Sequence, residues 1–483
     1  MAGGPALSSP VSPRVAELDR ALDQIGVTRS HHTIIFLILI GCLFDAFEQN
    51  AVGIVGPMLR EQWGLGATDI GMLNTVTFGA AAIGRIVSGF VADRYGRRVM
   101  LSIDLLLFTL GAGICAAAPN LTVMAIGRAV VGFGLGGEIA IAVTMLSEFC
   151  STKFRGTAVG LVNVGAGGMG NFLAPAFGLL VFTIFPGESS WRWLFVCLMV
   201  PALLGAFYRR YIPETPRFLL SQDRVKEVNV VLTKLASGKL SGKVDVEHAY
   251  IADDGSTNPT AKVKVRVTEI FRGALARRTI PLCITIWMAY GAQLSVLTLM
   301  PTILVGLGYT VSKSLLFTMI MQSGSLLGAI AASVLGFKFP RKRVLTIGAL
   351  CAGTAALTIG FIAQSIVLVL AAGAIFQFFV LLLNTTIWIF APELYPTKVR
   401  AFGTAFILAT GTAAGAFMPL VAGRLLDGFG VAGVFGMVAA MYAIFTVSVQ
   451  SVPETYGQSP DAIALPSEEE ASAHAIAPSP SRA

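Results

Sequence analysis

The residues most able to do chemistry in this sequence are charged side chains inside long apolar segments. Asp45, Glu48, Arg85, Arg128 and Glu138 all lie in such segments. A charge near the middle of a membrane costs about 2.5–3.5 kcal/mol on insertion scales, so each group needs a partner or a water-filled cavity. Asp45 and Glu48 are three residues apart, which would place them on one face of a helix. Two acids so placed repel each other when both are ionised, which favours protonation of one of them.

The balance of these charges indicates proton coupling. Three acids face two bases, so one carboxylate lacks a cation even if both arginines are paired. Such a carboxyl group can load a proton from one side of a membrane and release it to the other. We therefore predict Asp45, Glu48 and Glu138 as proton-coupling residues. Asp45 and Glu48 would be the carriers, Glu138 would pair with Arg85, and Asp104 is expected nearer a helix end.

The two deep arginines are candidates to bind an anionic solute. A guanidinium can hold a carboxylate through two parallel hydrogen bonds, which lysine cannot do. We predict Arg128 first, and Arg85 second, as substrate-binding residues. The alternative is that both arginines form structural ion pairs within the N-terminal half, with Glu48 closer to Arg128 than Asp45 is.

The apolar segments of the C-terminal half carry amides and aromatic rings in place of charges: Trp287, Tyr290, Gln293, Gln322, Gln377, Asn384 and Trp388. Such groups can stack on a flat organic solute and hydrogen-bond to it, although each is also compatible with packing. We predict that four of them bind substrate, namely Tyr290, Gln293, Asn384 and Trp388. The four histidines lie outside the apolar segments, so a histidine proton relay is not expected.

The composition excludes most other classes of protein. Of 483 residues, 55% are hydrophobic and only 13% are charged, and the mean hydropathy is +0.75. So few charges cannot cover a soluble globule of this size. The net charge of +8 comes from short basic loops between apolar runs, which argues against nucleic acid as a partner. The six cysteines form no metal or disulfide pattern, and no enzyme or nucleotide motif is present, so we expect no cofactor beyond a proton gradient.

The helices that would position these residues can be read from the apolar runs. A membrane-spanning helix needs about 20 apolar residues, and the sequence contains about twelve such runs. They lie near 33–55, 70–92, 99–118, 121–147, 156–184, 193–212, 279–304, 314–336, 344–363, 366–391, 400–423 and 430–451. Lysine and arginine concentrate in the loops after the second, fourth, eighth and tenth runs, which places both termini in the cytoplasm.

The chain also repeats itself. The E-x4-K-x-R pattern that begins at Glu148 recurs at Glu393, and the Pro-Glu-Thr that begins at Pro213 recurs at Pro453. We therefore predict an all-α integral membrane protein with twelve transmembrane helices in two pseudo-symmetric six-helix bundles. The predicted divisions are a cytoplasmic N-terminal tail, the first bundle, a cytoplasmic connector, the second bundle and a disordered cytoplasmic tail, at 1–32, 33–212, 213–278, 279–452 and 453–483.

The loop after the second run resembles a family signature. Residues 89–98 read G-F-V-A-D-R-Y-G-R-R, which is similar to the G-x3-D-R-x-G-R-R loop of the major facilitator superfamily. Asp93 could pair with basic groups at a neighbouring helix end and so latch one side of the protein in one transport state. In the second half, Phe337 and Pro340 replace the aspartate and the second glycine, so any latch should be asymmetric. The predicted gating residues are Gly89, Asp93, Arg94, Gly96, Arg97, Glu148, Arg155, Glu393 and Arg400.

Within that superfamily the sequence resembles the aromatic acid:proton symporters and the niacin-transporter-like metabolite symporters. The similarity spans residues 15–457 and includes the acids at Asp45 and Glu48, although the acid symporters usually read D-G-x-D there. It implies a monomeric, multi-pass inner-membrane symporter of protons and a small aromatic or nicotinate-like carboxylate. Sugar porters and drug antiporters remain alternatives, but their motifs are incomplete at 291–295 and 165–168. A receptor on a transporter fold should have lost the embedded charges, which are present.

Overall fold

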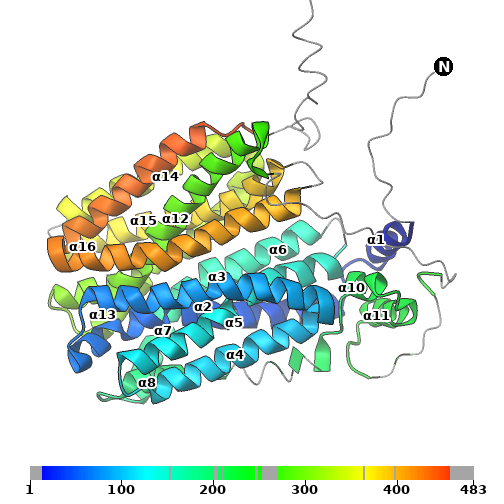
Figure 1. Ribbon diagram of the computed structural model, residues 1–483, viewed down its shortest axis with the longest axis horizontal. Helices are drawn as coiled ribbons and strands as arrows, with labels where there is room; N and C mark the ends of the chain where they lie inside the picture. The colour runs from blue at the N-terminus through cyan, green and yellow to red at the C-terminus, as the bar shows by residue number, and fades with distance from the viewer. Residues whose placement is uncertain are drawn as a thin grey trace, which may run out of the picture.

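The computed structural model describes residues 13–456, apart from 152–153, 201–204, 206, 209, 243, 245–248, 253–269, 363–364 and 396–398. The described part of the chain is helical and contains no strand. Its long helices run roughly side by side along the long axis of the molecule (Figure 1). Ten of the described helices are long and apolar enough to cross a membrane.

The first half follows the predicted order of helices. Its elements are α2 (Arg29–Trp63), α3 (Ala67–Tyr95), α4 (Arg97–Ala117), α5 (Leu121–Phe149), α6 (Arg155–Asn163), the π-helix η1 (Val164–Gly170), α7 (Asn171–Ile184) and α8 (Ser190–Cys197). The segment from α6 through η1 to α7 is a single candidate span. The sixth apolar run is divided between α8 and the helical residues described between 205 and 211.

The second half repeats this arrangement. Its elements are α12 (Gly273–Gly306), α13 (Val311–Lys338), α14 (Arg341–Leu357), the π-helix η3 (Thr358–Ile362), α15 (Ile366–Glu393) and α16 (Arg400–Gln450). The helix α16 is too long for one span and contains a break at Gly430, where φ is 66° and ψ is −157°. It therefore comprises the eleventh and twelfth apolar runs. Together with the divided sixth run, which is not among the ten long helices, this accounts for all twelve runs.

Three short helices pack together beyond one end of the bundle, which is called the connector side below (Figure 1). They are α1 (Pro13–Ile25), α10 (Pro216–Ser221) and α11 (Val225–Ser237). Leu18 and Leu22 of α1 belong to the same buried cluster as Leu232 of α11. Arg14 forms an ion pair with Asp223 at 2.7 Å. The connector and the segment before the first span are thus joined to each other.

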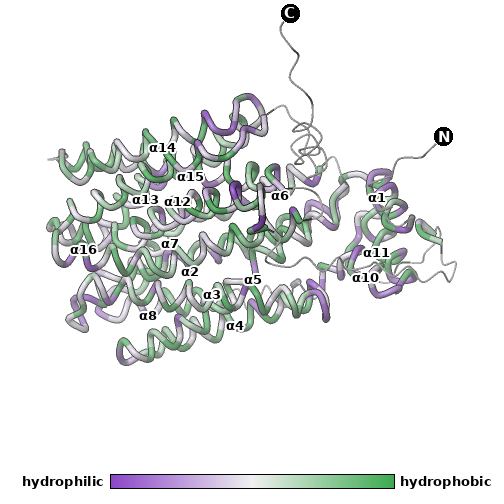
Figure 2. Tube along the Cα trace, turned by 45° about the horizontal axis from the view of Figure 1, so that its top comes forward, coloured by the Kyte–Doolittle hydropathy of each residue, from purple (hydrophilic) through white to green (hydrophobic). Residues whose placement is uncertain are grey.

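The outer surface of the bundle is apolar. Figure 2 shows hydrophobic residues along the length of the long helices and hydrophilic ones gathered at their ends and on the short helices. Large apolar side chains such as Phe90, Val367 and Val447 are more than 70% exposed. A surface of this kind is stable against lipid and costly in water.

Helix contacts depend on small residues where the backbones meet. A Cβ added at Gly324 or Gly328 of α13 would collide with the carbonyl oxygens of Ala374 and Phe378 on α15. This small-xxx-small spacing lets the two helices pack closely.

Candidate functional site

Arg128 and Glu48 form an ion pair with both side chains fully buried. Arg128 on α5 also donates from Nε to Thr77 Oγ1 at 3.0 Å and from Nη2 to the Glu48 carbonyl oxygen at 3.4 Å. These partners engage three nitrogens of its guanidinium with groups of the same half. The sequence favoured Arg128 over Arg85 as a substrate-binding residue, but this geometry supports the structural alternative.

Asp45 faces Glu138 rather than Glu48. Both carboxyl groups are buried, and they lie close enough to share a side-chain hydrogen bond. Two carboxylates only accept hydrogen bonds, so this contact is favourable when one of them carries a proton. The pairing of Glu138 with Arg85, expected from the sequence, is wrong, because the guanidinium of Arg85 binds backbone and hydroxyl oxygens instead.

Asp104 is a fourth buried acid beside this pair. Its side chain is inaccessible to solvent, it accepts a hydrogen bond from Ser88 Oγ at 3.1 Å, and it interacts electrostatically with both Glu138 and Asp45. Asp104 lies two turns inside α4, nearer a helix end than Arg85 or Glu138, as expected. Its burial beside the Asp45–Glu138 pair was not expected from the sequence.

Arg85 links the two halves. From α3 it donates to the Gly136 carbonyl oxygen at 3.1 Å, to Thr412 Oγ1 at 2.6 Å and to the Leu408 carbonyl oxygen at 3.4 Å. Thr412 and Leu408 belong to α16. All three acceptors are neutral, and in the described part of the chain no carboxylate lies within ion-pair distance of Arg85. This deep cation is available to an anionic ligand in a way that Arg128 is not.

The four predicted substrate residues of the second half form two hydrogen-bonded pairs between α12 and α15. Trp388 Nε1 donates to the Tyr290 hydroxyl at 2.7 Å, and Asn384 Nδ2 donates to Gln293 Oε1 at 2.5 Å. Tyr290 also interacts electrostatically with Arg85, which places the aromatic pair beside that cation. The Asn384 Oδ1 atom is buried and accepts no hydrogen bond. The aromatic pair is thus within electrostatic range of Arg85, and the amide pair lies one turn away along the same two helices.

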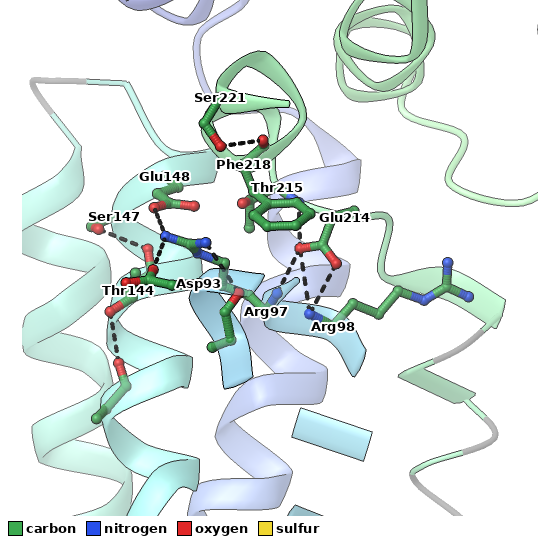
Figure 3. A network of polar contacts seen from close by, with 12 residues as sticks. Asp93, Arg97, Arg98, Thr144, Ser147, Glu148, Glu214, Thr215, Phe218 and Ser221 are labelled. Atoms are coloured by element: carbon green, nitrogen blue, oxygen red, sulfur yellow. Dashed lines mark hydrogen bonds and ion pairs between the residues drawn. The ribbon is translucent and has the colours of Figure 1, made fainter. Parts of the chain in front are cut away.

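A charged network closes the turn between α3 and α4 on the connector side (Figure 3). Arg97 pairs with Asp93 at 3.1 Å and with Glu148 of α5 at 3.5 Å. Glu214, before α10, accepts from the backbone N–H groups of Arg97 at 2.9 Å and of Arg98. Burial raises the pKa of the Glu214 carboxyl, and this effect outweighs the opposing hydrogen bonds from those N–H groups. The sequence singled out the Pro-Glu-Thr motif but assigned no partner to Glu214.

The two glycines and Arg94 of this loop have different structural roles. Gly96 has a φ of 106°, which other residues rarely adopt, and a Cβ there would collide with the Glu214 carboxylate. Gly89 has open space around it, and nothing in the structure explains a glycine there. Arg94 lies over the ring of Tyr95 at 5.8 Å, outside the Asp93–Arg97–Glu148 network.

The second half contains a counterpart of this network. Glu454 accepts from the backbone N–H groups of Arg341 at 3.0 Å and Lys342 at 2.9 Å, as Glu214 does at the start of α4. Arg341 pairs with Glu393 at 3.1 Å, as Arg97 pairs with Glu148. Pro340 precedes α14 where Gly96 precedes α4. The side chain of Phe337 lies outside the described residues, so the asymmetry of the latch stays a prediction.

The remaining two predicted gating residues contact different groups. Arg155 pairs with Asp19 of α1 at 3.6 Å, whereas Arg400 Nε donates to the Tyr395 carbonyl oxygen at 3.2 Å. Arg155 therefore joins the bundle to α1, and Arg400 closes a turn within its own half.

The two halves also meet on the side away from the connector. Asp427 of α16 accepts from the backbone N–H groups of Ala67 at 3.0 Å and Thr68 at 2.9 Å, and from the Thr68 hydroxyl at 2.7 Å. The carboxylate thus caps the first turn of α3, where the helix dipole favours negative charge. Asn74 of α3 and Thr298 of α12 form a further hydrogen bond between the halves.

Comparison with known proteins places this geometry in a class. The model of the "Sugar (and other) transporter" family matches residues 48–464. The chain belongs to this family of major facilitator superfamily transporters, and it is a transporter rather than an enzyme, as the sequence predicted. The partially occluded, inward-open xylose transporter XylE from Escherichia coli superposes with a TM-score of 0.71 at 18% identity, over 89% of this chain and 99% of XylE, which shows the twelve-helix fold.

Several relatives are named as transporters of aromatic compounds. The niacin transporter NiaP of Acinetobacter baylyi is 28% identical over 93% of this chain and 100% of its own length. The 4-hydroxybenzoate transporter PcaK of the same organism is 26% identical over 78% of this chain and 81% of its own. The benzoate transport protein of that organism is 23% identical over 86% of this chain and 87% of its own length. The resemblance to niacin and aromatic acid transporters of the major facilitator superfamily, stated from the motifs, is confirmed.

Proposed function

We propose that this protein couples the import of a small aromatic or nicotinate-like carboxylate to a proton, by alternating access between its two halves. The observation that carries the proposal is Arg85, a deep cation with only neutral acceptors, beside the Tyr290–Trp388 pair. The three aromatic-compound transporters among its relatives support this substrate class.

The substrate carboxylate would bind the guanidinium of Arg85 in place of the Thr412 hydroxyl and the Leu408 carbonyl oxygen. A charge-assisted bidentate contact is about twice as strong as a neutral hydrogen bond, so the exchange favours an acid over its neutral analogue. Because Arg85 lies on α3 and the oxygens it would release lie on α16, this exchange would also loosen a contact between the halves. The ring of the substrate would lie against Tyr290 and Trp388.

The proton would reside on the Asp45–Glu138 pair. Protonating either carboxyl turns a repulsive contact into a hydrogen bond, and no basic side chain within ion-pair distance of the two competes for it among the described residues. Asp104 and Glu48 are the other buried acids nearby, and Glu48 is neutralised by Arg128. Asp45 and Glu138 thus replace Asp45 and Glu48 as the proposed carriers, with a proton gradient as the energy source and no cofactor.

The connector side would face the cytoplasm. Arg97, Arg155, Arg341 and Arg400, the described basic residues that follow the second, fourth, eighth and tenth runs, lie at that end, as the positive-inside rule requires for both termini to be cytoplasmic. We place the protein in the inner membrane as a monomer.

A neutral metabolite such as a sugar is the second candidate substrate. The matching family is described as sugar and other transporters, the xylose transporter has the same fold, and the Gln293–Asn384 amide pair could bind hydroxyl groups.

Uptake into proteoliposomes separates the two candidates. Radiolabelled nicotinate, benzoate and 4-hydroxybenzoate would be compared with nicotinamide and xylose, with wild-type protein and the Arg85→Gln variant. The proposal predicts saturable uptake of the acids, little uptake of the neutral compounds, and a loss in the variant confined to the acids. Uptake of xylose in preference to all three acids would show that the substrate is a sugar and not a carboxylate.

A further inference from the structure

A cavity of about 600 Å³ lies on the connector side between the α3–α4 turn and the connector helices α10 and α11. Its lining includes apolar side chains, Val99 of α4, Leu219 of α10 and Val231 of α11. It also includes the basic side chains of Arg98, Arg210 and Lys234. A cavity lined by both apolar and cationic side chains fits an amphiphile with an anionic head.

The charges lining this cavity do not cancel. Its two acids are both engaged: Glu227 binds Arg224 at 2.6 and 2.7 Å, and Glu214 accepts from backbone N–H groups. The other charged lining residues are Arg98, Arg210 and Lys234, so four basic residues and two acids line the described part of the cavity. In the described part of the chain, no carboxylate lies within ion-pair distance of Arg210 or Lys234. The Arg98 side chain extends away from the Asp93–Arg97–Glu148 network (Figure 3).

The cavity continues into the lipid-facing surface of the bundle. Val99 lines it and is exposed, and Ile103, Leu106 and Leu110 are exposed farther along α4. Their spacing of four, three and four residues places them in one stripe along the helix, leading away from the cavity. A soluble anion would make no use of this stripe, whereas an acyl chain would lie along it.

From these observations we infer that the cavity binds the phosphate headgroup of an anionic phospholipid from the connector-side leaflet. The phosphate would contact Arg210, Lys234 and Arg98, and one acyl chain would follow the α4 stripe. Glu214 and Phe218 also line the cavity. Cζ of the Arg97 guanidinium lies 5.2 Å from the centroid of the Phe218 ring. The bound lipid would therefore hold the connector against the turn that contains the charged network.

The test is native mass spectrometry of detergent-purified full-length protein titrated with phosphatidylglycerol or phosphatidylcholine. Each basic residue near a membrane surface contributes about 1 kcal/mol to binding an anionic lipid. The double variant Arg210→Gln/Lys234→Gln should thus bind phosphatidylglycerol about 30-fold more weakly than wild type, since 1.4 kcal/mol is tenfold. The matched control is Lys226→Gln/Arg343→Gln, which removes the same charge from exposed positions on the connector side outside the cavity. It should bind as wild type does.

Three results would overturn the inference: undiminished binding by the double variant, an equal loss in the control, or displacement of the lipid by millimolar glycerol phosphate, which would assign the cavity to a soluble anion. A second experiment uses only the wild-type protein, so it does not depend on whether the variants fold. A photoactivatable phosphatidylglycerol should label residues 95–110 or 210–240, and labelling confined to other segments would contradict the site.

Discussion

Separating Arg128 from Glu48 should destabilise the protein more than any other single substitution in the first half. Both side chains have no accessible surface, so Arg128→Met leaves the Glu48 carboxylate buried beside the free Thr77 hydroxyl. Removing one partner of a buried ion pair costs about 3–5 kcal/mol, whereas replacing both by apolar groups is often neutral. We therefore expect Arg128→Met and Glu48→Leu each to lower the free energy of unfolding by about 3–5 kcal/mol. The double variant should regain most of that stability.

Thermal unfolding in detergent measures this cycle, with a dye that reacts with exposed thiols. Cys115 is a suitable reporter because it is buried and lies close enough to Arg128 and Glu48 to interact with both. Arg128→Lys keeps the positive charge but loses the two parallel hydrogen-bond donors of the guanidinium. Its thermal stability should therefore lie between those of wild type and Arg128→Met. The reasoning is refuted if Arg128→Met unfolds with wild-type stability while losing affinity for an acid substrate but not for its neutral analogue. That result would return Arg128 to the substrate site predicted from the sequence.

Three further outcomes follow from the turns and the contacts between halves. Gly96→Ala should destabilise the folded protein by about 1–3 kcal/mol, measured by thermal unfolding, because its φ is positive and its Cβ would meet Glu214; Gly89→Ala, in open space, is the matched control. Asp93→Asn should slow transport cycling while leaving substrate affinity intact, and transport at the wild-type rate would show that no latch depends on it. Asp427→Ala should raise labelling of a cysteine placed at Asn74 by a membrane-impermeant reagent, since it removes three hydrogen bonds that close that side; unchanged labelling would refute this.

The fold was predictable because its determinants are local. Apolar runs of membrane-spanning length, basic loops and a repeated pattern fix the number, direction and grouping of the helices. In α16 the eleventh and twelfth predicted runs follow each other without a loop: Arg424 and Asp427 lie between them, and the helix breaks at Gly430.

The pairing of the deep charges was only partly predictable, because it depends on how helices rotate and pack. Spacing along one helix put Asp45 and Glu48 on the same side, yet they contact different partners, Glu138 and Arg128. Asp45 lies twelve residues into the first apolar run and Glu138 ten residues before Glu148, so counting from the cytoplasmic ends gives the two acids similar depths. That similarity is the signal in the sequence for their pairing. Arg85 could not be assigned from the sequence, since its partners Thr412 and Leu408 lie more than 300 residues away.

The central claim is that the Asp45–Glu138 pair carries the proton that drives uptake of an acid bound at Arg85. The most direct test compares two assays of one variant, Asp45→Asn, in proteoliposomes: exchange of nicotinate at equal pH, and accumulation of nicotinate driven by an imposed pH gradient. The account predicts that exchange persists while accumulation above the equilibrium level disappears, and that Glu138→Gln behaves similarly. If both variants still concentrate nicotinate in response to the pH gradient, the proton is carried elsewhere and the claim is contradicted.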